Sequence, residues 1–230
     1  MTIFNTILTM FTFFASIRSS PINNCPSVQL QTNPPVNISE YMRKSWYIQQ
    51  QQVNGYQSEN DLFCVVATYN IDKNSKVPFF SGQVLSVYNY ANTGKVNGVP
   101  TGYFLNNTNA ILCARERDNN NPEKLSVAPC FLPNVLSGPY WIVYAGPTTD
   151  NYKWAIVSGG QPSVRVDNYT CTTKESGVNN SGLWIFSREQ VISNDELMYL
   201  RNILLAKNIS TEKLLNVPQN NCNYSKAYIK

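Results

Sequence analysis

The feature that most constrains the fold of this chain is a series of short apolar runs separated by turn-forming residues. Most runs are rich in Tyr, Phe, Val, Ile and Trp, and clusters of Asn, Gly, Pro and Asp lie between them. Regularly spaced strands with no helices between them predict an antiparallel barrel or sandwich. The predicted strands are Ser45–Gln51, Phe63–Ile71, Val77–Val87, Tyr103–Leu105, Ala110–Arg115, Lys124–Ala128, Tyr140–Ala145, Tyr152–Ser158 and Gly182–Ser187.

One convincing helix follows the last strand, over residues 193–208. Ser193 and Glu196 form a capping box at its start, and Lys207 lies in its last turn. Apolar residues repeat at helical spacing, so one face must pack on another element. We expect that face to lie against the outer wall of the sheet. The apolar positions are Leu197, Leu200, Ile203 and Leu204.

Length and charge favour a single soluble domain. At 230 residues, with 43% apolar and 14% charged residues, the chain can bury a sizeable core. The formal net charge is only +4, and the longest basic cluster is Arg115–Arg117 with Glu116 in its middle. Nucleic acid is therefore not expected as a partner.

The chain contains no histidine, which removes many kinds of site at once. Ser-His-Asp and Cys-His catalysis, histidine acid/base chemistry and the commonest zinc and haem sites all need an imidazole. We expect no catalytic residues, no metal and no cofactor.

The first 19 residues read as a secretory signal peptide. An apolar run from Ile7 to Ala15 precedes small residues, and it is too short to span a bilayer. We therefore expect residues 20–230 to form one secreted domain with no stable membrane insertion. Six Asn-x-Ser/Thr sequons agree with an extracellular glycoprotein. The glycosylation candidates are Asn37, Asn106, Asn168, Asn179, Asn208 and Asn223.

The six cysteines are even in number and scattered, with no C-x-x-C pair. This usage predicts disulfides in an oxidising compartment rather than a thiolate metal site. Six cysteines allow 15 pairings, and the spacing alone does not choose among them. They are Cys25, Cys64, Cys113, Cys130, Cys171 and Cys222.

Four ordered stretches resemble the landmarks of the lipocalin family of the calycin superfamily. They are "CPSVQLQTNPPVNISEYMRKSWYIQQQ", "GPYWIVYAGPTTDNYKWAIVSG", "GLWIFSRE" and "LRNILLAKNISTEKLLNVPQNNC". This chain differs from the family pattern at Lys44, where a glycine is usual, and at a corner lengthened to Thr149–Tyr152. Residues 160–182 also make the last hairpin longer.

The resemblance implies an all-β fold, an eight-stranded antiparallel up-and-down barrel with the C-terminal helix on its side. The barrel would span about residues 40–190, and a disulfide-tethered tail would span residues 209–230. The resemblance also implies that Arg188 stacks on Trp46 at the closed floor, a structural role. By the same resemblance Cys64 pairs with Cys222 and Cys25 with Cys171, which leaves Cys113–Cys130.

Side-chain alternation then assigns the inner wall. If Lys153 points to water, Tyr152, Trp154 and Ile156 face inward, while Ala155 and Val157 face the helix. No charge marks either face of Tyr140–Tyr144, so its orientation stays open.

The same alternation, counted from the floor residues, predicts four more ligand-binding positions. Trp184 and Phe186 face inward if Arg188 does, and Ile48 and Gln50 follow Trp46. Gln50 is the polar group expected to orient a ligand. In a solid core the same aromatic rings would simply pack on one another, so their role in binding rests on the resemblance.

Three functions remain open. The favoured one is a secreted carrier that binds a small hydrophobic molecule such as a fatty acid, sterol, retinoid or pigment inside the barrel. The second is an enzyme of the same fold acting on a lipid or pigment, which would need a free thiol or an acid such as Asp150 or Glu116. The third is a secreted protein-binding module. Neither the ligand nor the oligomeric state follows from the sequence.

Overall fold

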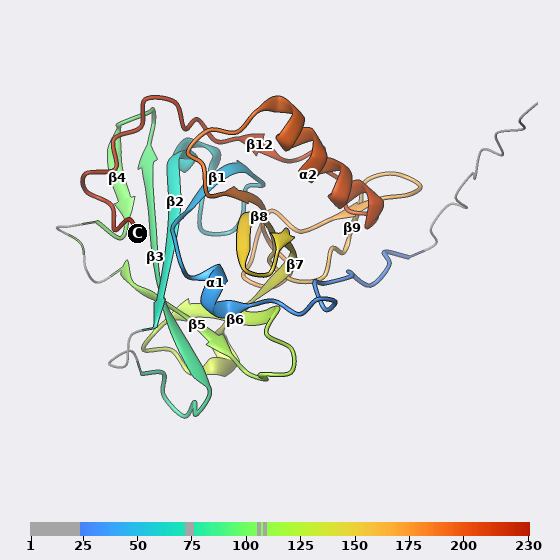
Figure 1. Cartoon of the computed structure of the whole chain (residues 1–230), viewed down its shortest axis with the longest axis horizontal. Helices are drawn as coiled ribbons and strands as arrows, with labels where there is room; N and C mark the ends of the chain where they lie inside the picture. The colour runs from blue at the N-terminus through green and yellow to red at the C-terminus, as the bar shows by residue number, and fades with distance from the viewer. Residues whose placement is uncertain (1–23, 72–75, 105–106, 108–109) are drawn as a thin grey trace, which may run out of the picture.

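Eight antiparallel strands close into a barrel in the computed structural model, which describes residues 24–71, 76–104, 107 and 110–230 (Figure 1). Consecutive strands pair around the wall, and β11 pairs with β1 to close it. The predicted signal peptide and Asn106 lie outside the described residues. The barrel strands are β1 (Trp46–Gln51), β2 (Phe63–Ile71), β3 (Gln83–Thr93), β5 (Leu112–Glu116), β6 (Lys124–Pro129), β7 (Gly138–Thr148), β8 (Asn151–Ser158) and β11 (Leu183–Ser187).

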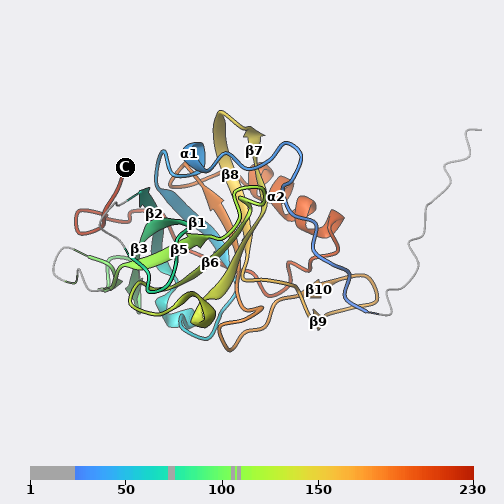
Figure 2. The same ribbon diagram turned by 90° about the horizontal axis from the view of Figure 1, so that it is seen from below.

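Shorter elements decorate the barrel. Strand β4 pairs with the end of β3, and β12 pairs with β1. Strands β9 and β10 form a separate two-stranded sheet beside the barrel (Figure 2). These elements are α1 (Ile38–Tyr41), η1 (Glu59–Asp61), β4 (Val99–Gly102), η3 (Asn134–Leu136), β9 (Val164–Arg165), β10 (Cys171–Thr172), α2 (Asn194–Ala206) and β12 (Leu215–Asn216).

The predicted all-β barrel with a C-terminal helix is confirmed, with two strands placed differently. The third barrel strand runs from Gln83 to Thr93 rather than over Val77–Val87. Pro78 cannot donate a backbone hydrogen bond inside a paired strand, whereas "VYNYANT" after Leu85–Ser86 continues the strand pattern. The fourth strand is Val99–Gly102. Tyr103 and Phe104 of the predicted run Tyr103–Leu105 follow it outside any strand, and Leu105 lies outside the described residues.

Helix α2 lies along the outside of the barrel, as predicted (Figure 1). The Ser193 hydroxyl accepts from the backbone N–H of Glu196, and the Glu196 carboxylate accepts from that of Ser193, which completes the capping box. Leu200 and Leu204 are fully buried against the outer faces of β7, β8 and β11. No helix among the described residues is long and apolar enough to cross a membrane.

Three disulfides cross-link segments of the chain. They are Cys25–Cys171, Cys64–Cys222 and Cys113–Cys130, the pairing that the family resemblance implies. The first anchors the segment before β1 to β10, and the second anchors the C-terminal tail to the start of β2. The third joins β5 to the turn after β6. None of the six cysteines is free.

Arg115, from the longest basic cluster of the sequence, is not a surface residue. Its side chain is fully buried on the outer face of β5 and donates to the carbonyls of Cys113, Ala128, Pro129 and Leu132. It therefore braces the turn that carries Cys130.

Candidate functional site

Two hydrophobic clusters separate the inside of the barrel from the surface under the helix. The inner cluster draws residues from all eight barrel strands and from α1. The outer cluster joins β7, β8 and β11 to α2. A residue's cluster therefore shows which way its strand side chain points.

The floor of the barrel is a cation stacked on an indole. The Arg188 guanidinium carbon lies 3.4 Å from the centroid of the fully buried Trp46 ring. Its N–H groups donate to the backbone carbonyls of Glu40 (2.8 Å) and Tyr41 (3.0 Å), and also to that of Lys44. Burial lowers the pKa of Arg188, although each of its five N–H donors has a carbonyl partner. The predicted stack is thus present.

Replacing Arg188 by Ala should lower the free energy of unfolding by about 1 to 3 kcal/mol, because it removes the stack and the carbonyl contacts together. Ligand affinity should stay unchanged, since the Trp46 ring lies between Arg188 and the interior. Denaturant unfolding of Arg188→Ala beside Lys153→Ala, an exposed position, measures the difference. Unaltered stability with abolished binding would instead place Arg188 against the ligand.

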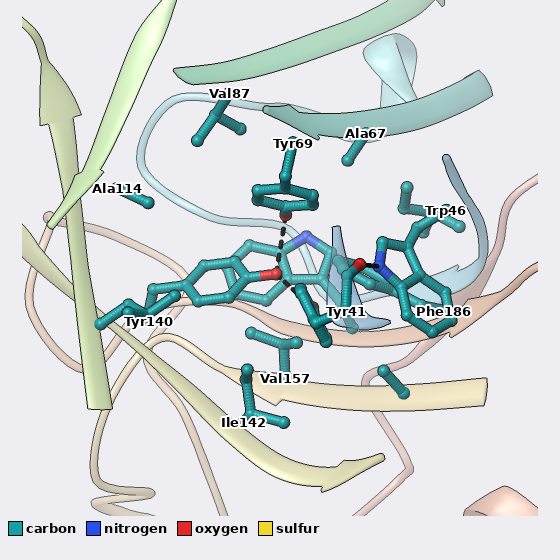
Figure 3. Packing of buried hydrophobic residues seen from close by; sticks show 14 of the residues in the cluster. Tyr41, Trp46, Ala67, Tyr69, Val87, Ala114, Tyr140, Ile142, Val157 and Phe186 are labelled. Carbon is teal, nitrogen blue, oxygen red and sulfur yellow. Dashed lines mark hydrogen bonds between the residues drawn. The ribbon is translucent and has the colours of Figure 1, made fainter. Parts of the chain in front are cut away.

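Three tyrosines meet in the middle of the barrel, and the sequence interpretation missed their convergence (Figure 3). The hydroxyl of Tyr140, on β7, lies 2.7 Å from that of Tyr41 and 2.7 Å from that of Tyr69, on β2. Burial raises the pKa of all three phenols, so they stay protonated near neutral pH. We call Tyr41, Tyr69 and Tyr140 the tyrosine triad.

Above the triad, the inner wall becomes less tightly packed. Leu112 and Val127 are only half-buried although they face inward. Trp184 also belongs to the inner cluster and is 9% exposed. Tyr56, on the loop between β1 and β2, is 65% exposed.

Trp154 and Ile156 face the helix, so the predicted inward orientation is wrong for both. Ile156 belongs to the outer cluster, and the Trp154 ring lies 5.8 Å from that of Tyr199 on α2. The residues that face inward are Ala155 and Val157. The cause is a bulge at Lys153, where Pro147 pairs with Tyr152 and Gly146 with Trp154. One extra residue there reverses the alternation beyond it.

A second bulge reverses the prediction for Gln50. The register of β1 against β11 passes from Ile48–Phe186 to Gln50–Ile185, which skips Gln49. Gln50 consequently points outward and accepts from Arg201 of α2 at 2.8 Å. Gln51 takes the inward position opposite Trp184 and is fully buried. Its amide nitrogen donates to Gln57 Oε1, while its Oε1 has no hydrogen-bond partner.

The remaining predicted wall residues face inward. Ile48 and Phe186 are nearly fully buried beside the floor, and the rings of Phe186 and Trp46 lie 6.1 Å apart. Tyr152 also faces inward, but its hydroxyl accepts from the Asn37 N–H at the closed end. Of the predicted set, Trp184 is the residue nearest the open half. The orientation of Tyr140–Tyr144, which alternation left open, follows from a further bulge in β7. Tyr140 and Ile142 point inward, and Tyr144 points outward.

Five predicted sequons are among the described residues. Asn208 is half-buried and its Nδ2 donates to the Tyr169 carbonyl, whereas Asn37 caps α1. Asn168, Asn179 and Asn223 are exposed. Their surface positions agree with the glycosylation prediction, which stays a prediction.

The described residues hold no group of three or more His, Cys, Asp or Glu side chains that would suit a metal ion. All six cysteines are in disulfides, which removes the thiol-based version of the enzyme interpretation. Asp150 lies in an exposed turn, where its carboxylate accepts from the Thr148 hydroxyl. Glu116 is buried, and burial raises its pKa.

Comparisons with known proteins found similar chains both by sequence and by structure. Mouse apolipoprotein D is 24% identical over 201 residues, which cover 87% of this chain and 85% of the relative. Among solved structures, apocrustacyanin C2 has a TM-score of 0.54 at 17% identity and covers 89% of this chain and 93% of its own. Insecticyanin from the tobacco hornworm Manduca sexta has a TM-score of 0.50 at 18% identity and covers 89% of this chain and 92% of its own. No family model matches the chain.

Proposed function

The chain has the lipocalin fold, and on that premise we propose that it is a secreted carrier that takes a small hydrophobic molecule into its barrel. The sequence resemblance to lipocalins is confirmed. The observation that carries the proposal is the inner wall, which is apolar, is sealed at the floor by Trp46 and Arg188, and has half-buried side chains at Leu112 and Val127.

Apolar burial would supply most of the binding free energy. Each Å² of apolar surface removed from water contributes about 25 cal/mol, and the half-buried inward side chains offer such a surface. The three disulfides support the secreted part of the proposal, because structural disulfides persist in oxidising compartments.

A tryptophan-emission titration tests the carrier proposal. A fatty acid or retinoid at micromolar concentration should quench or shift the emission, since Trp184 would exchange water for ligand contact. Trp184→Ala should weaken binding by about 1 to 3 kcal/mol while leaving the fold intact.

Two control variants lie outside the barrel. Lys153→Ala and Trp154→Phe should leave the affinity unchanged, because both side chains are on the outer face of β8. A screen of lipids, retinoids, sterols and tetrapyrroles without any saturable signal, on folded protein free of bound cargo, would refute the carrier proposal.

A further inference from the structure

The tyrosine triad has one more O–H donor than it uses. Its three hydroxyls carry three protons, while two hydrogen bonds, Tyr41–Tyr140 and Tyr69–Tyr140, join them. Whichever way the two bonds are directed, one proton is left without an acceptor inside the triad. No other described residue accepts from these hydroxyls. A buried donor without a partner is costly, so this position favours a ligand atom that accepts.

Tyr140 is the least buried member of the triad. It keeps 9% of its surface exposed, against 0% for Tyr41 and 2% for Tyr69. When Tyr41 and Tyr69 both donate to the Tyr140 oxygen, the spare proton is that of Tyr140. The side chains of Ile142 and Val157, which lie beside the triad on the inner wall, are apolar (Figure 3).

The charges on the inner wall disfavour an anionic ligand. No Lys or Arg occupies a described inward-facing position of the eight barrel strands. Arg188 donates its N–H groups to backbone carbonyls at the floor, and its guanidinium stacks on the Trp46 ring. Glu116 is buried and lies two residues after the inward-facing Ala114 on β5, so alternation places its carboxyl group on the inner wall as well.

A second unpartnered atom on the wall also disfavours a carboxylate. Gln51 is fully buried and faces inward opposite Trp184, and its Oε1 is an acceptor that has no donor among the described residues. An acceptor repels carboxylate oxygens, and a carboxylate buried without a cation pays a large desolvation cost.

We propose that the cargo is an uncharged hydrophobic molecule with a carbonyl-type acceptor, such as a ketone or an ester, and that this acceptor binds the Tyr140 hydroxyl. The inference rests on the carrier function proposed above and narrows its ligand class. It excludes free fatty acids and other carboxylates as the preferred cargo.

Two probes with the same skeleton test the inference, namely all-trans-retinoic acid and its methyl ester. Quenching of tryptophan emission at neutral pH gives both dissociation constants. The wild-type protein should bind the ester at least about 10-fold more tightly than the acid, because only the acid must bury an unpaired charge. Tyr140→Phe should weaken ester binding by about 5- to 10-fold, the equivalent of one hydrogen bond.

Tyr144→Phe is the matched control, because it removes a hydroxyl from the same strand on the outer face. It should leave both dissociation constants unchanged. The acid–ester comparison needs no variant, so it stands even if Tyr140→Phe fails to fold. Equal affinity for the two probes, or a folded Tyr140→Phe protein that binds the ester as wild type does, would overturn the inference while leaving the carrier function intact. Failure to bind either probe would count against the carrier function itself.

Discussion

Replacing both Cys64 and Cys222 by Ala should lower the free energy of unfolding by about 5 kcal/mol, whereas removing Cys113–Cys130 should cost about 3 kcal/mol. The two bonds span 158 and 17 residues of sequence. A longer closed loop restricts the unfolded chain more, so its removal releases more conformational entropy.

The tail that Cys222 holds also covers the outer face of the sheet. Gln219 donates to the carbonyls of Ile48 and Val65, and the Tyr224 ring lies 5.3 Å from that of Tyr47. Losing the tether therefore exposes packed surface as well. Denaturant unfolding of the two double variants and the wild-type protein measures both costs. Equal losses would show that loop length does not set the stabilisation here.

The architecture could be predicted because its sequence signals are local. Strand runs, the capping box of Ser193 and Glu196, and the apolar stripe of α2 each lie within a few neighbouring residues. The floor stack and the disulfides join residues far apart in sequence, and the family resemblance supplied them where pattern alone left 15 pairings open.

The inner wall could be predicted only in part, because alternation fails at each bulge. Counting from Arg188 along β11 gave the correct orientation of Trp184 and Phe186, since that strand has no bulge against β8. Counting across Gln49 or Lys153 gave the wrong face, because one inserted residue shifts every later side chain. Nothing in a single sequence marks either bulge unambiguously. The lengthened corner at Thr149–Tyr152 was the one visible hint.

The triad escaped prediction for a different reason. Its hydroxyl contacts join residues 99 and 71 positions apart, from α1, β2 and β7. Tyrosine is common in the predicted strands of this chain, so no local pattern separates these three from the others. Their convergence depends on barrel closure and strand tilt, which are properties of the whole sheet.

The stability of the protein should fall steeply above pH 10 because of the triad. In the unfolded chain a tyrosine titrates near pH 10. In the folded barrel burial raises the pKa of Tyr41, Tyr69 and Tyr140 well above that value. Below pH 10 both states are protonated, and the stabilisation is complete. Above it the unfolded state binds fewer protons, so the free energy of unfolding decreases by up to about 1.4 kcal/mol per pH unit for each tyrosine.

The titration of Arg188 has the opposite effect on the free energy of unfolding. Burial lowers its pKa, so the folded state loses this proton before the unfolded state does, and this offsets the contribution of up to one tyrosine. The three tyrosines less Arg188 therefore contribute a slope of up to about 3 kcal/mol per pH unit once the unfolded tyrosines ionise. Denaturant unfolding at a series of pH values, with tyrosinate absorbance followed in parallel, gives the slope. Tyr140→Phe should reduce this slope by about the contribution of one tyrosine, whereas Tyr169→Phe, at an exposed loop position, should leave the slope unchanged. Tyrosinate absorbance near pH 10 that is smaller in folded Tyr140→Phe than in the folded wild-type protein would show that the triad is open to solvent, and would contradict the buried hydrogen-bonded arrangement.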